Sequence, residues 1–192
     1  MDNPKSPEFD LRSPVASTAA VLRAIFLRPK AFYLNFDPGG PLQGPVAFVL
    51  LVSAVSAILR LLILLADLRG EVDAAGLAVL EALVYVALSP LVVGLFSGAY
   101  FLSVRGFVGP EGSFRGVYRI LAYACGAAIL FWVPVLIAFA FTYATLVLMT
   151  IGIYCVYRVP FLTALTAALV GYVPSATLFI FLMGFITNST SG

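Results

Sequence analysis

Long apolar runs separated by short polar segments occupy the chain from residue 45 onward. A helix rises 1.5 Å per residue, so about 20 apolar residues cross a hydrocarbon core roughly 30 Å thick. The pattern therefore predicts an all-α fold, a polytopic transmembrane helix bundle with about five spans. The expected spans are residues 45–66, 74–104, 117–134, 137–157 and 161–186, which form a transmembrane domain over 45–187 followed by a tail at 188–192.

Prolines decide how two of these runs are divided. The run 74–104 is longer than one crossing needs and has Pro90 near its centre. We expect one tilted helix kinked at Pro90, and the alternative is a half-helix followed by a shorter span. The run 117–157 is about double one crossing and must reverse. Trp132 and Pro134 mark the expected reversal, because tryptophan favours the interface and proline has no N–H to satisfy.

The first 44 residues differ from the rest in composition. Residues 1–15 mix charges with three prolines, which predicts a disordered cytoplasmic tail. Residues 16–44 predict an interfacial amphipathic helix and a link, because apolar residues recur at helical spacing from Val21 to Phe26. Ser17 or Thr18 would cap this helix. A short helix packed on other protein is the alternative. The expected interfacial anchors are Phe26, Phe32, Tyr33 and, at the later reversal, Trp132.

The distribution of basic residues predicts the topology. Lysines and arginines near the spans gather before the first span, between the second and third, and between the fourth and fifth; they are Arg23, Arg28, Lys30, Arg105, Arg115, Arg119 and Arg158. Basic loops stay in the cytoplasm. We therefore expect a multi-pass cell-membrane protein with a cytoplasmic N-terminus and an extracytoplasmic C-terminus.

Composition narrows the function classes. The chain is 62 % hydrophobic and 10 % charged, whereas soluble domains carry charges on about a quarter of their residues. Its net charge of +2 is too small to indicate nucleic-acid binding. The absence of histidine removes Ser-His and Cys-His pairs and HExxH metal sites. Cys125 and Cys155 lie apart in apolar runs, as packing residues do. We expect no catalytic, cofactor-binding or metal-binding residues, and no enzyme.

Arg60 and Glu81 are the two charges deep inside expected spans. Arg60 lies ten residues before Gly70 and Glu81 eleven residues after it, so antiparallel helices place them at one depth. Charged residues inside membranes pair or face water. We expect an intramembrane ion pair. The alternatives are a polar cavity or transport path, and an Arg60 side chain that extends outward alone.

Small residues at helical spacing predict close helix contacts. Gly94 and Gly98 form a GxxxG motif, typical either of packing within the bundle or of a dimer contact. The pairs Ala122/Gly126 and Ala167/Gly171 predict further contacts within the bundle.

Two blocks of the sequence carry a family resemblance. Residues 24–50 read AIFLRPKAFYLNFDPGGPLQGPVAFVL, with a Pro-basic-x-Phe-aromatic stretch, a glycine-containing link and an apolar helix in that order. Residues 112–169 contain Phe-Arg after a glycine, Arg-x-x-x-Tyr, a mid-membrane proline and Ile-Gly. Together they resemble the Yip family, membrane proteins named for their interaction with Ypt/Rab GTPases.

The resemblance implies a five-span protein with a cytoplasmic N-terminus, and the short tail suggests a prokaryotic member. The chain has Tyr157-Arg158 where many relatives carry histidine, and it lacks the long acidic N-terminus of eukaryotic members. A role tied to that histidine therefore does not carry over, and the resemblance leaves open whether any GTPase interaction is retained. We expect a noncatalytic protein that associates through its helices with membrane lipids, an unknown protein partner or further copies of itself. The alternative is a small transporter or channel with a polar path near Arg60 and Glu81.

Overall fold

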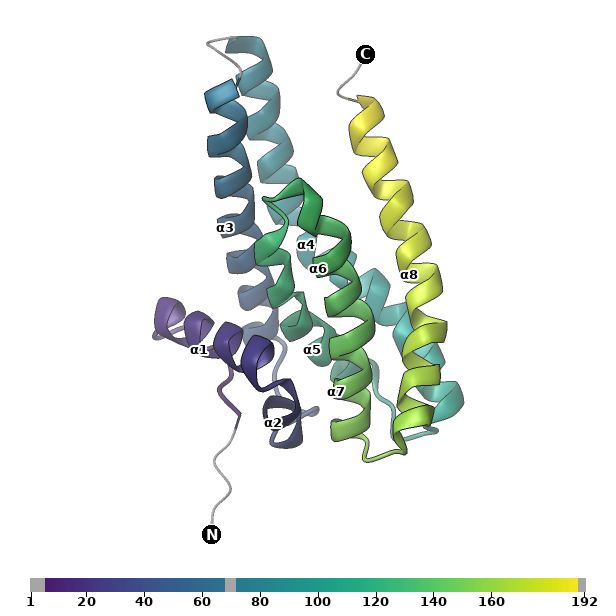
Figure 1. Ribbon diagram of the computed structural model, residues 1–192. Coiled ribbons are helices and arrows are strands. Elements are labelled where there is room, and N and C mark those ends of the chain that lie inside the picture. Colours follow the sequence, from purple (N-terminus) through teal and green to yellow (C-terminus); the bar gives the residue numbers. More distant parts are fainter. Residues whose placement is uncertain (1–5, 68–71, 190–192) are drawn as a thin grey trace.

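The computed structural model describes residues 6–67 and 72–189, and every regular element within these ranges is a helix (Figure 1). The all-α bundle prediction is confirmed. The elements are α1 (Pro14–Leu27), α2 (Pro29–Leu34), α3 (Gln43–Asp67), α4 (Val72–Phe107), α5 (Phe114–Ala124), η1 (Cys125–Leu130), η2 (Pro134–Leu136), α6 (Ile137–Thr142), η3 (Tyr143–Leu148), α7 (Met149–Val156) and α8 (Phe161–Ser189). Of these, η1 and η2 are 3₁₀-helices and η3 is a π-helix.

Four stretches of the described chain are helical, long and apolar enough to cross a membrane. They are Gln43–Ala66, Ala75–Phe107, Pro134–Val156 and Phe161–Leu182. The segment expected as a regular third span, 117–134, is instead divided between α5 and η1. These elements have 11 and 6 residues, a combined rise of about 28 Å. Residues Gly116–Ala124 are all buried, so α5 is surrounded by protein.

Helix α4 continues through Pro90, as the preferred interpretation predicted. Proline lacks an N–H, so the carbonyl four residues earlier, that of Val86, loses its usual helical donor. The Ser89 hydroxyl donates to this carbonyl at 2.8 Å and satisfies it. A half-helix reading of this run is therefore wrong, because the local side chain replaces the missing bond and the helix need not end.

The chain reverses where expected, in the turn over 131–133 that contains Trp132 and precedes η2. From there α6, η3 and α7 run back beside α5 (Figure 1). Within the π-helix, the carbonyl of Thr145 accepts a hydrogen bond from the buried Tyr100 hydroxyl of α4. This side-chain bond ties the returning helix to α4.

The N-terminal residues correct two expectations. Residues 6–13 are not a disordered tail: Phe9 is buried, and its N–H donates to the Tyr123 hydroxyl at 3.3 Å. Helix α1 begins at Pro14, with Ser13 at the N-cap position, rather than at a cap from Ser17 or Thr18. Proline suits the first helical position because its missing N–H has no helical partner there. Residues 1–5 lie outside the described part.

Helix α4 packs against α3 along its first half and against α8 along its second (Figure 1). The α3–α4 hairpin extends beyond the turn at Trp132, as Figure 1 shows. We call the end of the bundle with α2 and the start of α5 the Arg119 end. The opposite end, with the second half of α3 and the first half of α4, is the Arg60 end.

Glycines permit two of the closest helix contacts. A Cβ on Gly171 of α8 would lie 2.4 Å from the Tyr100 ring, and one on Gly126 would lie 3.0 Å from Ile25 of α1. The small-residue pairs at 122/126 and 167/171 thus lie at contacts within the bundle, as predicted.

Candidate functional site

Arg119 of α5 is a fully buried cation at the Arg119 end, with 0 % of its side chain exposed. Its Nε donates to the Asp37 carbonyl at 3.0 Å, and its Nη1 donates to the Pro41 carbonyl. Its Nη2 lies 2.8 Å from both carboxylate oxygens of Glu8. A buried charge needs this kind of compensation, because it has lost its water shell.

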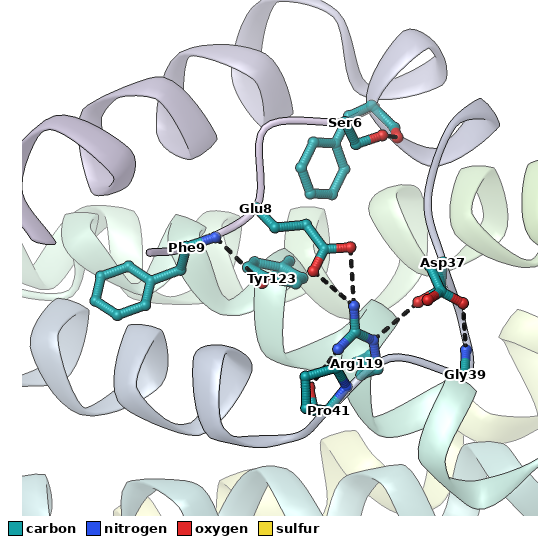
Figure 2. Close-up of polar contacts among 9 residues, drawn as sticks. Ser6, Glu8, Phe9, Asp37, Gly39, Pro41, Arg119 and Tyr123 are labelled. Atoms are coloured by element: carbon teal, nitrogen blue, oxygen red, sulfur yellow. Dashed lines mark hydrogen bonds and ion pairs between the residues drawn. The ribbon is translucent and has the colours of Figure 1, made fainter. Parts of the chain in front are cut away.

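Two segments therefore converge on the guanidinium that α5 carries, as Figure 2 shows. The segment before α1 supplies Glu8, and the link between α2 and α3 supplies the carbonyls of Asp37 and Pro41. A Cβ on Gly40 of that link would lie 2.7 Å from the guanidinium, so only glycine fits there without displacement. We call Glu8, Asp37, Gly40, Pro41 and Arg119 the Arg119 cluster. It attaches the N-terminal segment and the link to the bundle.

Aromatic side chains surround this cluster on the bundle side. The Tyr123 ring packs 5.6 Å from Phe32 and 5.4 Å from Phe48, centroid to centroid. The Phe36 ring lies 5.1 Å from the Arg119 guanidinium, within cation–π range. An apolar layer of this kind excludes water and strengthens the ionic contacts beside it.

Phe32 and Tyr33 do not face a lipid interface, which corrects the expectation that they are anchors. Both are buried, and the Tyr33 hydroxyl donates to the Ile120 carbonyl at 3.2 Å. Burial raises the pKa of Tyr33 well above its ordinary value, so its hydroxyl stays a neutral donor. Both side chains lie against protein rather than at a membrane surface. Phe26 is partly exposed and stacks on Tyr143, and Trp132 is half-buried in its turn.

Sequence reasoning missed the Arg119 cluster. It counted Arg119 among the basic residues of a loop and Glu8 in a disordered tail, whereas the structure places Arg119 inside α5. One signal was available, since the Arg-x-x-x-Tyr element consists of Arg119 and Tyr123. One helical turn places both side chains on the same face. Phe9 bonds to Tyr123 and Glu8 to Arg119, so this face receives the N-terminal segment.

Arg60 and Glu81 meet, as counting from the hairpin predicted. Arg60 Nη2 lies 3.3 Å from Glu81 Oε1, and the two side chains are 53 % and 29 % exposed. The pair therefore differs from Arg119 and Glu8 in having one largely accessible cation. Arg60 also lines a shallow hollow together with Trp132 and Pro134 of the reversal.

A cavity of about 240 Å³ lies beside this pair, lined from α3, α4, η1, α6, η3 and α8. Most lining side chains are apolar, among them Val49, Leu61, Phe96, Phe141 and Phe179. Two of the hydroxyl groups in its wall, those of Ser89 and Thr145, donate to carbonyls of their own helices. The cavity is thus an apolar chamber with one ion pair at the Arg60 end.

Gly94 and Gly98 are not sites of close packing within the bundle. A Cβ on Gly94 would come no nearer than 3.9 Å to Tyr118, and one on Gly98 would meet nothing within 4 Å. The intramolecular reading of this GxxxG motif is therefore wrong, because the neighbouring helices leave room for side chains there. The dimer reading stays a prediction.

Neither site resembles a metal centre. No group of three or more His, Cys, Asp or Glu side chains that could hold a metal ion occurs in the described part of the chain. Cys155 is buried, and Cys125 is partly buried and lines the cavity.

Long apolar helices and the buried polar contacts between them define a multi-pass α-helical membrane protein. The family model for the Yip1 domain matches residues 23–186. The chain therefore belongs to the Yip family. No curated protein and no solved structure matches it significantly.

Proposed function

We propose that this Yip-family protein is noncatalytic and acts by association within the membrane, with lipids and with other proteins, in membrane organisation. The observation that carries the proposal is the form of the cavity. Its walls are mostly apolar, with scattered hydroxyl groups, and toward the Arg119 end its lining ends at Val49, Phe96 and Thr145. Beyond these residues the bundle is filled by buried side chains such as Tyr100 and Leu148.

A solute path needs polar groups along its whole length, because an ion in an apolar channel loses its hydration without compensation. Here the charges are confined to one end, so the cavity suits an apolar occupant better than a transported ion. Association therefore explains the geometry better than the transporter or channel alternative.

The distribution of basic and of exposed apolar residues supports a membrane orientation and a contact face. The proposed location is the cell membrane. The positive-inside rule favours an N-terminus in the cytoplasm, which would put the Arg119 cluster on the cytoplasmic side. Exposed apolar residues of α4 around the GxxxG motif, such as Leu91 and Leu95, offer a face for another helix or a second copy.

Flux through reconstituted protein tests the proposal. The full chain is placed in vesicles of phosphatidylethanolamine and phosphatidylglycerol, and potassium and proton leak are followed with dyes. We expect leak equal to that of protein-free vesicles, with no effect of Glu81→Gln. A saturable flux that Glu81→Gln abolishes would establish the transport alternative instead.

Site-specific crosslinking tests the association directly. A photoreactive residue at Leu95, beside both glycines, should give one discrete protein adduct in native membranes. The same residue at Leu162 of α8, which is also exposed, is the matched control and should give only lipid adducts. Identical adduct patterns at both positions would contradict a specific helix face.

A further inference from the structure

We propose that the cavity binds one zwitterionic phospholipid of the ethanolamine type, with an acyl chain in the chamber and its headgroup at Arg60 and Glu81. This inference rests on the proposed function, because it names a lipid as one of the associated molecules. Four observations carry it: the length of the chamber, its opening, the position of the charges and their signs.

The chamber is long and narrow enough for a chain. Its lining on α3 runs from Val49 to Leu64, a rise of about 22 Å at 1.5 Å per residue. One leaflet of a roughly 30 Å hydrocarbon core is about 15 Å deep, so the chamber exceeds it. Its volume of about 240 Å³ is also larger than the apolar cavity of about 150 Å³ that is known to hold benzene.

The lining of the chamber reaches the surface of the bundle, where a lipid would enter. Leu64 of α3 and Leu88 of α4 line it and are also exposed on the molecular surface. An acyl chain can therefore pass between helices without leaving an apolar environment. A water-soluble ligand would have to cross that apolar surface first.

The charges lie near headgroup level. Arg60 shares its shallow hollow with Trp132 and Pro134, and tryptophan concentrates at the boundary between headgroups and acyl chains. Arg60 is 53 % exposed, so its guanidinium is accessible to a ligand that replaces or joins Glu81. By contrast, Arg119 is fully buried, and two other segments of the chain already occupy its donors.

The signs of the charges select the headgroup. A phosphate accepts hydrogen bonds from two N–H groups of an arginine, and a primary ammonium donates to a carboxylate. A headgroup with both groups satisfies Arg60 and Glu81 together. An anionic headgroup would satisfy Arg60 alone and place a second negative charge beside Glu81, which is unfavourable. Without lipid, the two side chains compensate each other at 3.3 Å.

Native mass spectrometry of the purified full chain tests this binding. The added lipids are phosphatidylethanolamine, phosphatidylglycerol and diacylglycerol with the same acyl chains. We expect one phosphatidylethanolamine per chain to remain after loosely bound lipids have dissociated. Its apparent affinity should exceed that of phosphatidylglycerol by about tenfold, the effect of one charge-assisted hydrogen bond. Equal retention of all three lipids would overturn the proposal.

Two variants test the roles of the chamber and of the charged pair separately. Ala57→Phe fills the chamber, since Ala57 lines it, and should abolish the retained lipid. Ala87→Phe on the exposed face of α4 is the matched control and should retain it. Glu81→Gln removes the partner of the ammonium and should cancel the preference over phosphatidylglycerol.

Retention of lipid by Ala57→Phe, or an unchanged preference in Glu81→Gln, would overturn the proposal. Glu81→Gln keeps the test decisive even if Ala57→Phe does not fold. Failure of the unsubstituted chain to retain phosphatidylethanolamine, without ion flux, would refute this inference alone, whereas a Glu81-dependent flux would refute the proposed function.

Discussion

The two ends of the bundle each hold an Arg–Glu pair, yet the pairs differ in almost every physical respect. Arg119 is 0 % exposed and bonds to Glu8 and to two backbone carbonyls. Arg60 is 53 % exposed and has Glu81 at 3.3 Å. The first pair joins three segments of chain, and the second borders a cavity. The surroundings of an ion pair, more than its chemistry, therefore decide whether it stabilises the fold or remains accessible to a ligand.

The largest effect should come from Arg119→Ala. It removes donors from the Asp37 and Pro41 carbonyls and leaves a hole where a large side chain was buried. We expect the free energy of unfolding in mixed micelles to fall by about 3 to 5 kcal/mol, as for other broken buried pairs. Arg115→Ala, which changes an exposed arginine one turn earlier, is the control and should have little effect. Equal losses would mean that burial does not distinguish these arginines.

Glu8→Ala should have the next largest effect, because it leaves the buried guanidinium without a counter-charge. Glu8 itself is 34 % exposed, so water can replace part of the lost interaction. We expect a loss of about 2 kcal/mol and faster hydrogen exchange over residues 6–13, while the bundle helices stay protected. The control is Glu111→Ala in an exposed turn. Unchanged exchange over 6–13 would show that Glu8 does not attach this segment.

Gly40→Ala tests the packing of the Arg119 cluster separately from its charges. The added methyl group would lie 2.7 Å from a guanidinium held by several hydrogen bonds. We expect a loss of about 1 to 2 kcal/mol from overpacking, measured by the same unfolding. Gly39→Ala is the neighbouring control, because its methyl group would meet Asp37 at an ordinary 3.4 Å. If both variants unfold alike, the close approach at Gly40 is unimportant.

The smallest effect should come from the Arg60–Glu81 pair. For Arg60→Ala, Glu81→Ala and the double variant, thermal unfolding in detergent should give a coupling energy below about 1 kcal/mol, because both side chains are partly exposed. A coupling of about 3 kcal/mol or more, typical of buried pairs, would remove the difference between the two ends.

Much of the fold could be predicted because a lipid environment leaves few alternatives. Backbone groups in hydrocarbon must bond within their own helix, so apolar runs of sufficient length become helices. The helices α3, α4 and α8 lie where the runs predicted, and the chain reverses at Trp132. The contact between Arg60 and Glu81 could also be predicted by counting residues, because a tight hairpin brings together residues at equal distances from its centre.

Other features depended on contacts between distant segments. The partners of Arg119 lie 111, 82 and 78 residues away, and the local Arg-x-x-x-Tyr spacing cannot say which distant segments cover that face. The aromatic residues Phe32 and Tyr33 were expected to anchor the chain at the membrane surface, because the sequence could not say whether lipid or protein covers them. The cavity likewise depends on how α8 approaches α3 and α4. The sequence by itself thus determined the helices and their order, because these follow from local bonding. Tertiary packing alone decided which charged side chains are buried by protein and which remain accessible to a ligand.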